Sequence, residues 1–168
     1  MSGSETVVVR RCTAADAAHM GAREPAASGY ARGALARQRA GLTDFLVALV
    51  DGVVVGSGEL TSGDPAQLKS LAVEPAARGQ GVGSAIIVAA EAMVVGRVGR
   101  VERVGPNGEG HRRLVLGVGL DNPRAAALYE RLGYVRSGVV TTTTYEYVDD
   151  LGVTRTATET DEDLVKTW

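Results

Sequence analysis

Apolar runs separated by turn signals characterise the first half of the chain. Residues 45–50 form an unbroken apolar run, and Asp51-Gly52 separates it from a second apolar-rich run over 53–60. An Asp-Gly pair between two such runs is typical of a tight β-hairpin. Short apolar runs bounded by Gly, Pro and Asp are typical of strands. The pattern predicts four strands in this half of the chain: residues 7–11, 45–50, 53–60 and 67–73.

A longer spacing of apolar residues predicts helices. Apolar residues recur with a helical period between positions 82 and 94, so a helix over 83–96 would bury one face. Thr13 is a favourable N-cap with an acidic residue, Asp16, three positions later, which predicts a short helix from residue 13. The Ala-, Arg- and Leu-rich segment 29–40 is also helical in pattern.

The segment 122–132 carries helix signals at both ends. Asn122 is a favourable N-cap, Pro123 suits the first helical position, and Gly133 suits the position after the last turn. The other C-terminal segments are expected to be strands, at residues 113–119, 134–140, 141–148 and 164–168. A polar loop around 149–152 is expected to join the last two of these strands. This order of elements predicts an α+β (mixed α/β) fold with a central sheet of about seven strands and about four helices.

Composition and charge exclude several classes of protein. The 168 residues suit a single domain over 1–168, and a formal net charge of −2 argues against a nucleic-acid partner. No apolar run is long enough to span a membrane, and the N-terminus lacks the pattern of a secretory signal. Cys12 is the single cysteine, which favours a reducing cytoplasm and a buried apolar residue over a nucleophile.

A glycine-rich segment carries the strongest chemical signal. Gly79, Gly81 and Gly83 alternate between an apolar strand and an apolar helix, so main-chain N–H groups and the helix N-terminus can converge on an anion such as a pyrophosphate. Arg78 adds a positive charge. No Lys follows the glycines as a P-loop requires, and Ser84 stands where a dinucleotide fingerprint needs its third glycine.

This segment, Arg78-Gly-Gln-Gly-Val-Gly preceded by Val-Glu-Pro, resembles the acyl-CoA loop of the GCN5-related N-acetyltransferase (GNAT) superfamily. Asn122-Pro-Arg-Ala-Ala-Ala-Leu-Tyr129, followed by Gly133-Tyr134, resembles a second signature of the same family. The resemblance extends from about residue 5 to the C-terminus.

The resemblance implies a sheet that splays between its fourth and fifth strands, here 67–73 and 113–119, with acetyl-CoA in the gap. The pantetheine arm would pair with the main chain of Leu71 and Val73. The residues expected to bind acetyl-CoA are Leu71, Ala72, Val73, Arg78, Gly79, Gln80, Gly81, Val82, Gly83, Ser84, Asn122 and Tyr129.

Acetyl transfer also needs an acid, an oxygen-binding donor and a route for the amine proton. Tyr129 is the expected acid for the leaving thiolate, against the alternative that its ring only packs on the sheet. Asn122 is expected to bind the pantetheine arm, to cap its helix, or to do both. A main-chain N–H at the end of strand 67–73 is expected to bind the thioester oxygen.

The base is the weakest part of the pattern. Many members carry Glu-Leu-Lys where this chain has Gln67-Leu68-Lys69, and Gln cannot accept a proton. Glu59 is the expected catalytic carboxylate, acting through water, with Glu74 as a second candidate. Both positions also suit ordinary strand-end carboxylates, and an enzyme that selects the neutral amine would need no base.

The resemblance therefore implies an N-acetyltransferase that uses direct attack in a ternary complex on a primary amine. A small-molecule acceptor is favoured, and protein N-termini or lysines stay open. A non-catalytic acyl-CoA sensor is the alternative. No metal is expected, because His19 and His111 lie far from other ligand residues. The Gly- and Arg-rich stretch 95–110 is expected to be a solvated surface loop, and the sequence leaves a homodimer open.

Overall fold

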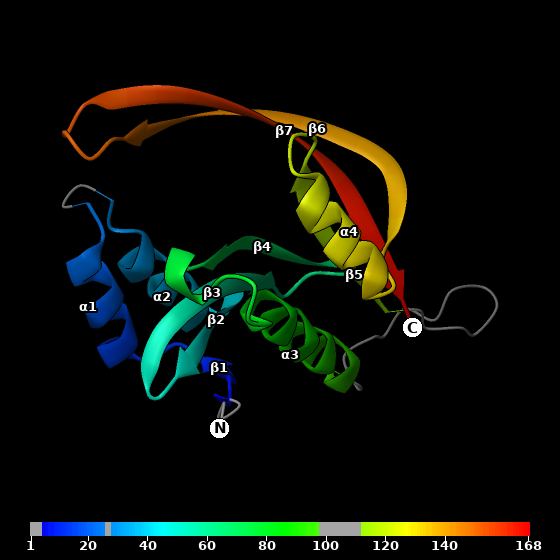
Figure 1. Ribbon diagram of the computed structural model, residues 1–168, viewed down its shortest axis with the longest axis horizontal. Helices are drawn as coiled ribbons and strands as arrows, with labels where there is room; N and C mark the ends of the chain where they lie inside the picture. Colours follow the sequence, from blue (N-terminus) through cyan, green and yellow to red (C-terminus); the bar gives the residue numbers. More distant parts are fainter. Residues whose placement is uncertain (1–4, 26–27, 98–111) are drawn as a thin grey trace.

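A mixed sheet forms the centre of the computed structural model, which describes residues 5–25, 28–97 and 112–168 (Figure 1). The described residues form seven strands in the order β1-β2-β3-β4-β5-β7-β6. The β4–β5 pair is parallel, and the other neighbours are antiparallel. The strands are β1 (Val8–Arg11), β2 (Thr43–Val50), β3 (Val53–Thr61), β4 (Ala66–Val73), β5 (Arg113–Gly119), β6 (Val135–Val148) and β7 (Thr154–Thr167).

Helices cover both faces of the sheet, which divides the buried residues into two cores. Phe45 and Val47 of β2 pack with the helices that precede this strand, whereas Leu46 and Ala48 pack with the helix that follows β4. This division follows from the alternation of side chains along a strand. The helices within the described residues are α1 (Ala14–Arg23), α2 (Tyr30–Arg39), α3 (Val82–Gly96) and α4 (Pro123–Arg131), with a 3-10 turn at Pro75–Ala77.

The predicted α+β class is confirmed, and so are most of the predicted elements. Asp51 and Gly52 both have positive φ in the turn between β2 and β3, as a tight hairpin requires. None of the helices in the described part of the chain is long and apolar enough to cross a membrane. Most of the stretch 95–110, predicted to be a surface loop, lies outside the described residues.

The predicted C-terminal strands are wrong in their limits. Residues 134–140 and 141–148 were expected as two strands, but β6 is continuous, and the register shift near Gly138 (φ 79°) interrupts pairing without ending the strand. β7 begins at Thr154, not at residue 164. Its polar first half is held by cross-strand contacts, including hydroxyl pairs between Thr142 and Thr160 and between Thr144 and Thr158, both at 3.0 Å.

The outer half of the β6–β7 hairpin is a two-stranded arm. β5 pairs with β7 from Asp161 to Thr167, and within the described residues Thr154–Thr160 pair only with β6. In Figure 1 the arm curves away from β5 and ends on the same side of the view as α1 and α2.

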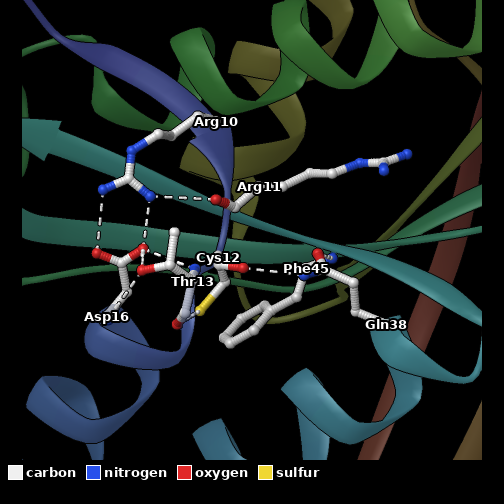
Figure 2. A network of polar contacts seen from close by, with 7 residues as sticks. All are labelled: Arg10, Arg11, Cys12, Thr13, Asp16, Gln38 and Phe45. Carbon is white, nitrogen blue, oxygen red and sulfur yellow. Dashed lines mark hydrogen bonds and ion pairs between the residues drawn. The ribbon is translucent and has the colours of Figure 1, made fainter.

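A polar network joins β1 to α1 (Figure 2). The Asp16 main-chain N–H donates to the Thr13 hydroxyl at 3.2 Å, and the Thr13 N–H donates to the Asp16 carboxylate at 2.8 Å, which completes a capping box. Arg10 donates to both Asp16 carboxylate oxygens. The Arg10 hydrogen bonds are the main reason why the pKa of Asp16 falls to about 2.

Gln38 of α2 continues this network to the end of β1 (Figure 2). Its amide nitrogen donates to the Cys12 carbonyl at 2.9 Å, and its amide oxygen accepts from the Phe45 N–H at 2.8 Å. Cys12 is buried, and burial raises the pKa of its thiol to about 11. These contacts are consistent with the interpretation of Cys12 as a packing residue.

We expect Asp16→Asn to lower the free energy of unfolding by about 2 kcal/mol at pH 7, since a folded pKa near 2 lies well below the ordinary value near 4. A depressed pKa stabilises the fold above the unfolded-state value, and this stabilisation is lost as the pH falls from about 4 towards 2. Urea unfolding at pH 7 and at pH 2.5 measures the change, with the exposed Asp150→Asn as control. A difference between wild type and Asp16→Asn that persists unchanged at pH 2.5 would contradict the assignment.

Candidate functional site

The sheet opens between β4 and β5, and the opening forms a cavity. Within the described residues the two strands pair at only three positions, from Ala66 with Leu114 to Leu68 with Leu116, and then diverge. The predicted splay between the fourth and fifth strands is therefore confirmed. The cavity has a volume of about 580 Å³. It is lined by Gln67–Leu71 of β4, Leu116–Asn122, Ala125, Tyr129 and Thr158–Asp161 of β7.

A β-bulge in β4 lies where the opening begins. Ser57 pairs with Ala72 and Glu59 pairs with Lys69, so Ser70 and Leu71 together oppose a single residue of β3. Ser70 has a φ of 54°, a left-handed conformation that costs a non-glycine residue about 1–3 kcal/mol unless its surroundings hold it. Nothing in the sequence indicates this bulge.

The main chain beyond the bulge faces the opening. The Glu74 N–H donates to the Val55 carbonyl at 2.8 Å. Because hydrogen-bonded and non-hydrogen-bonded pairs alternate along an antiparallel ladder, the polar main-chain groups of Leu71 and Val73 point away from β3. An amide-bearing ligand arm in the opening can pair with them as an added strand. The Val73 carbonyl accepts a hydrogen bond from Arg78 Nε at 3.1 Å.

The glycine-rich loop leads from the end of β4 into α3. Gly79 and Gly81 have φ of 75° and 80°, and Gly81 is the N-cap of α3. A Cβ on either residue would meet no atom of the described chain within 4 Å. These glycines therefore supply conformation, and they leave the helix N-terminus open to an anion. Gln80 donates to the Ala76 carbonyl at 3.1 Å, which holds the loop against the 3-10 turn.

Tyr129 and Asn122 both line the cavity. Tyr129 is 8% exposed and packs in the core on the α3 face, and burial raises the pKa of its phenol above the ordinary value. The Asn122 side chain accepts from the Ala125 N–H at 3.1 Å, so it is the N-cap of α4. Each residue therefore has a structural role, and each also lines the cavity.

Glu59 lies below the sheet surface in a saturated polar cluster. Its side chain is 2% exposed, and its carboxylate accepts two hydrogen bonds from Arg37 at 2.9 and 3.1 Å, one from Tyr30 at 3.1 Å and one from Thr43 at 3.4 Å. Burial alone would raise the pKa of Glu59, but the contacts with Arg37 outweigh it and hold this pKa below its ordinary value. These contacts make Glu59 a weak base.

The structure brings some predicted site residues together and separates others. Leu71, Asn122 and Tyr129 share the larger cavity, as does Gln67. Ala72 and Val73 line a second cavity of about 210 Å³, which Glu74 also borders. Within the described chain, neither Glu59 nor the loop 78–84 lines the larger cavity.

Sequence reasoning missed the acidic wall of the larger cavity. Asp121, Glu159 and Asp161 line it, and burial, followed by repulsion from neighbouring carboxylates, raises the pKa of Asp161. Gly119 leaves room for Asp121, because a Cβ on Gly119 would lie 2.6 Å from an Asp121 oxygen. The strand that carries Glu159 and Asp161 was not predicted, so its facing could not be assigned. No group of three or more metal-ligating side chains is found within the residues described.

Comparisons with known proteins agree with this architecture. The model of the acetyltransferase (GNAT) domain matches residues 41–136, more than half of the chain. No curated protein is significantly similar to the chain in sequence.

Several solved acetyltransferases share the fold. Ribosomal-protein-S18-alanine N-acetyltransferase from Escherichia coli superposes with a TM-score of 0.61 at 20% identity, covering 96% of this chain and 94% of that one. An IAA acetyltransferase from Bacillus cereus superposes with a TM-score of 0.61 at 17% sequence identity, covering 97% of this chain and 100% of that one. A PaiA N-acetyltransferase from Thermoplasma acidophilum in complex with coenzyme A superposes with a TM-score of 0.61 at 16% sequence identity, covering 97% of this chain and 99% of that one. Given the family match over most of the sheet and its opening, this chain belongs to the GNAT family of acetyl-CoA-dependent N-acetyltransferases.

Proposed function

We propose that this chain transfers an acetyl group from acetyl-CoA to a primary amine of a small molecule by direct attack in a ternary complex. The observation that carries the proposal is the cavity at the β4–β5 opening, which Tyr129 lines together with Ser70 and Leu71 of β4, beyond the last β4–β5 pair. Its volume falls in the range of small-ligand sites, roughly 300–1,000 Å³.

The binding of acetyl-CoA follows from three features along β4. The main chain of Leu71 and Val73 would pair with the pantetheine arm, with Ala72 between them and Asn122 on the opposite side. The glycine-rich loop and the first turn of α3 would bind the pyrophosphate through N–H groups. Arg78 would then exchange its contact with the Val73 carbonyl for a ligand contact.

The chemistry requires one bond to form and one to break. The amine nitrogen attacks the thioester carbonyl carbon, the C–S bond breaks, and the thiolate takes a proton. A main-chain N–H at the β4 bulge would bind the carbonyl oxygen, and a preorganised donor of this kind stabilises the charge that develops there. The raised pKa of Tyr129 keeps its phenol protonated at neutral pH, so it can donate to the leaving sulfur.

The proton on the acceptor amine is the remaining requirement. Glu59, acting through water, stays the predicted base. Its contact with Arg37 and its lowered pKa favour the alternative in which the enzyme takes the neutral amine. Glu74 is exposed and lies 3.6 Å from Arg23, which suits an ordinary surface ion pair.

The acceptor class rests on the acidic wall of the cavity. Asp121, Glu159 and Asp161 would attract a cationic amine, and Asp161 borders the region opposite β4. Structural relatives include one enzyme named for a ribosomal-protein alanine and one named for IAA, so the fold alone does not select the acceptor. A cytoplasmic location and a homodimer stay predictions from the sequence.

A panel of amines tests this function. With acetyl-CoA, we expect CoA release above hydrolysis for small amines, and higher kcat/KM for diamines than for monoamines of equal length. Peptides with an N-terminal alanine serve as the comparison. Binding of acetyl-CoA without CoA release for any amine would favour the sensor alternative. Preference for the peptides would contradict the small-molecule assignment.

A further inference from the structure

A polar cluster around the buried Glu59 lies beside the bulge of β4, and the lowered pKa of this carboxylate favours a role other than proton transfer. We propose that Arg37, Glu59 and Tyr30 form a clamp that holds the Ser70 bulge, and that the clamp thereby positions the main-chain donor for the thioester oxygen. The inference rests on the proposed acetyl transfer and assigns these three side chains as positioning residues.

The bulge needs a support, because Ser70 adopts a left-handed conformation inside a strand. This φ is unfavourable for a serine, so contacts with surrounding residues must hold the Ser70 main chain in place. The bulge at Ser70 and Leu71 also follows directly after the last β4–β5 pair, at Leu68. A regular strand at this point would alternate its N–H groups between β3 and β5, so the extra residue decides which N–H faces the cavity.

Tyr30 connects the bulge to the buried carboxylate. Its hydroxyl donates to Glu59 at 3.1 Å. Burial raises the pKa of Tyr30 to about 12, and the Ser70 side chain lies near enough to its hydroxyl to lower this pKa in part. The Tyr30 ring is fixed by an edge-to-face contact with Phe45, with ring centroids 6.0 Å apart.

Glu59 and Arg37 anchor Tyr30. Glu59 is the strand partner of Lys69, the residue before the bulge, and its buried carboxylate accepts a bidentate pair of hydrogen bonds from Arg37. Arg37 lies on α2 together with Tyr30, so the clamp ties this helix to Glu59 of β3 and holds the Tyr30 hydroxyl beside Ser70 of β4. Ser70 lines the cavity, whereas within the described chain the three clamp residues lie outside its lining. The clamp therefore acts through the position of the bulge.

Tyr30→Phe tests the clamp, because it removes one hydroxyl and keeps the ring. We expect kcat to fall roughly fivefold with the acetyl-CoA KM within twofold and with an unchanged pH profile, as for loss of geometry at an oxygen-binding donor. Glu59→Gln should act in the same direction. Tyr147→Phe, on the exposed arm, is the matched control and should leave kcat unchanged.

Amide hydrogen exchange gives a readout that does not depend on turnover. In Tyr30→Phe, the amide of Ala72, which pairs with Ser57 of β3 beyond the bulge, should exchange faster than in wild type, while the amides of β2 keep their protection. If the wild type releases no CoA with any amine, the proposed function fails, but amide exchange still tests whether the clamp holds the bulge. Unchanged amide exchange together with unchanged kcat in Tyr30→Phe would overturn the clamp. A Glu59→Gln activity that recovers at high pH, when wild type does not change, would make Glu59 a base instead.

Discussion

Tyr129→Phe is expected to lower kcat about 100-fold, while the affinity for acetyl-CoA changes little. The phenol is the proton donor for the leaving thiolate in the proposed reaction, and a positioned acid contributes about 10²–10⁴-fold. The phenylalanine ring keeps the packing of Tyr129 in the core. Steady-state kinetics with the best amine of the panel measures kcat, and calorimetry measures acetyl-CoA binding.

Tyr134→Phe is the matched control for this variant. Tyr134 is buried, and its hydroxyl donates to Glu91 at 2.9 Å, away from the cavity lining within the described residues. Its loss should lower stability and leave kcat within a factor of about two. If kcat of Tyr129→Phe also stays within a factor of two or three, Tyr129 is a packing residue or water replaces it as the acid.

Gly81→Val is expected to weaken acetyl-CoA binding by a factor of ten or more, which is about 1.4 kcal/mol. Two effects combine at this position. The φ of 80° is strained for any β-branched residue, and the added side chain would project into the open space at the start of α3 where the pyrophosphate would lie. Calorimetry measures the affinity, and circular dichroism checks the fold.

Gly41→Val separates these two effects. Gly41 has a φ of 75°, and its Cβ would also meet no described atom within 4 Å, but it follows α2 far along the chain from the loop. It carries the strain without the obstruction, so its stability should fall and its acetyl-CoA affinity should not. An equal loss of affinity in both variants would refute the pyrophosphate site.

Local signals made the scaffold predictable from the sequence. The Asp51-Gly52 turn fixed a hairpin register, and Thr13 with Asp16 marked a helix start, because both act through neighbouring residues. The alternating glycines could be placed between β4 and α3, and Tyr129 on α4, since they lie next to strong strand and helix patterns. The opening between β4 and β5 was predicted from the family resemblance and not from the periodicity of the sequence.

Longer-range features could not be predicted in this way. The ion pair between Arg37 and Glu59 joins residues that are 22 positions apart, and nothing near Glu59 in the sequence marks it as buried. The Ser70 bulge has no glycine to signal its positive φ. Thr154–Asp163 lack the apolar alternation of a strand, because their pairing depends on hydroxyl and charged partners across the hairpin.

The sheet has two halves, β1–β4 and β5–β7. In the described structure, strand pairing joins these halves at only three positions, all between β4 and β5. A ligand arm that pairs with β4 and contacts β5 or α4 would act as a cross-link between these halves. Binding of the ligand would then raise the free energy of unfolding of the whole domain, by about 2.7 kcal/mol when the ligand is present at 100 times its Kd. The melting temperature of this protein should therefore follow the concentration of acetyl-CoA around it.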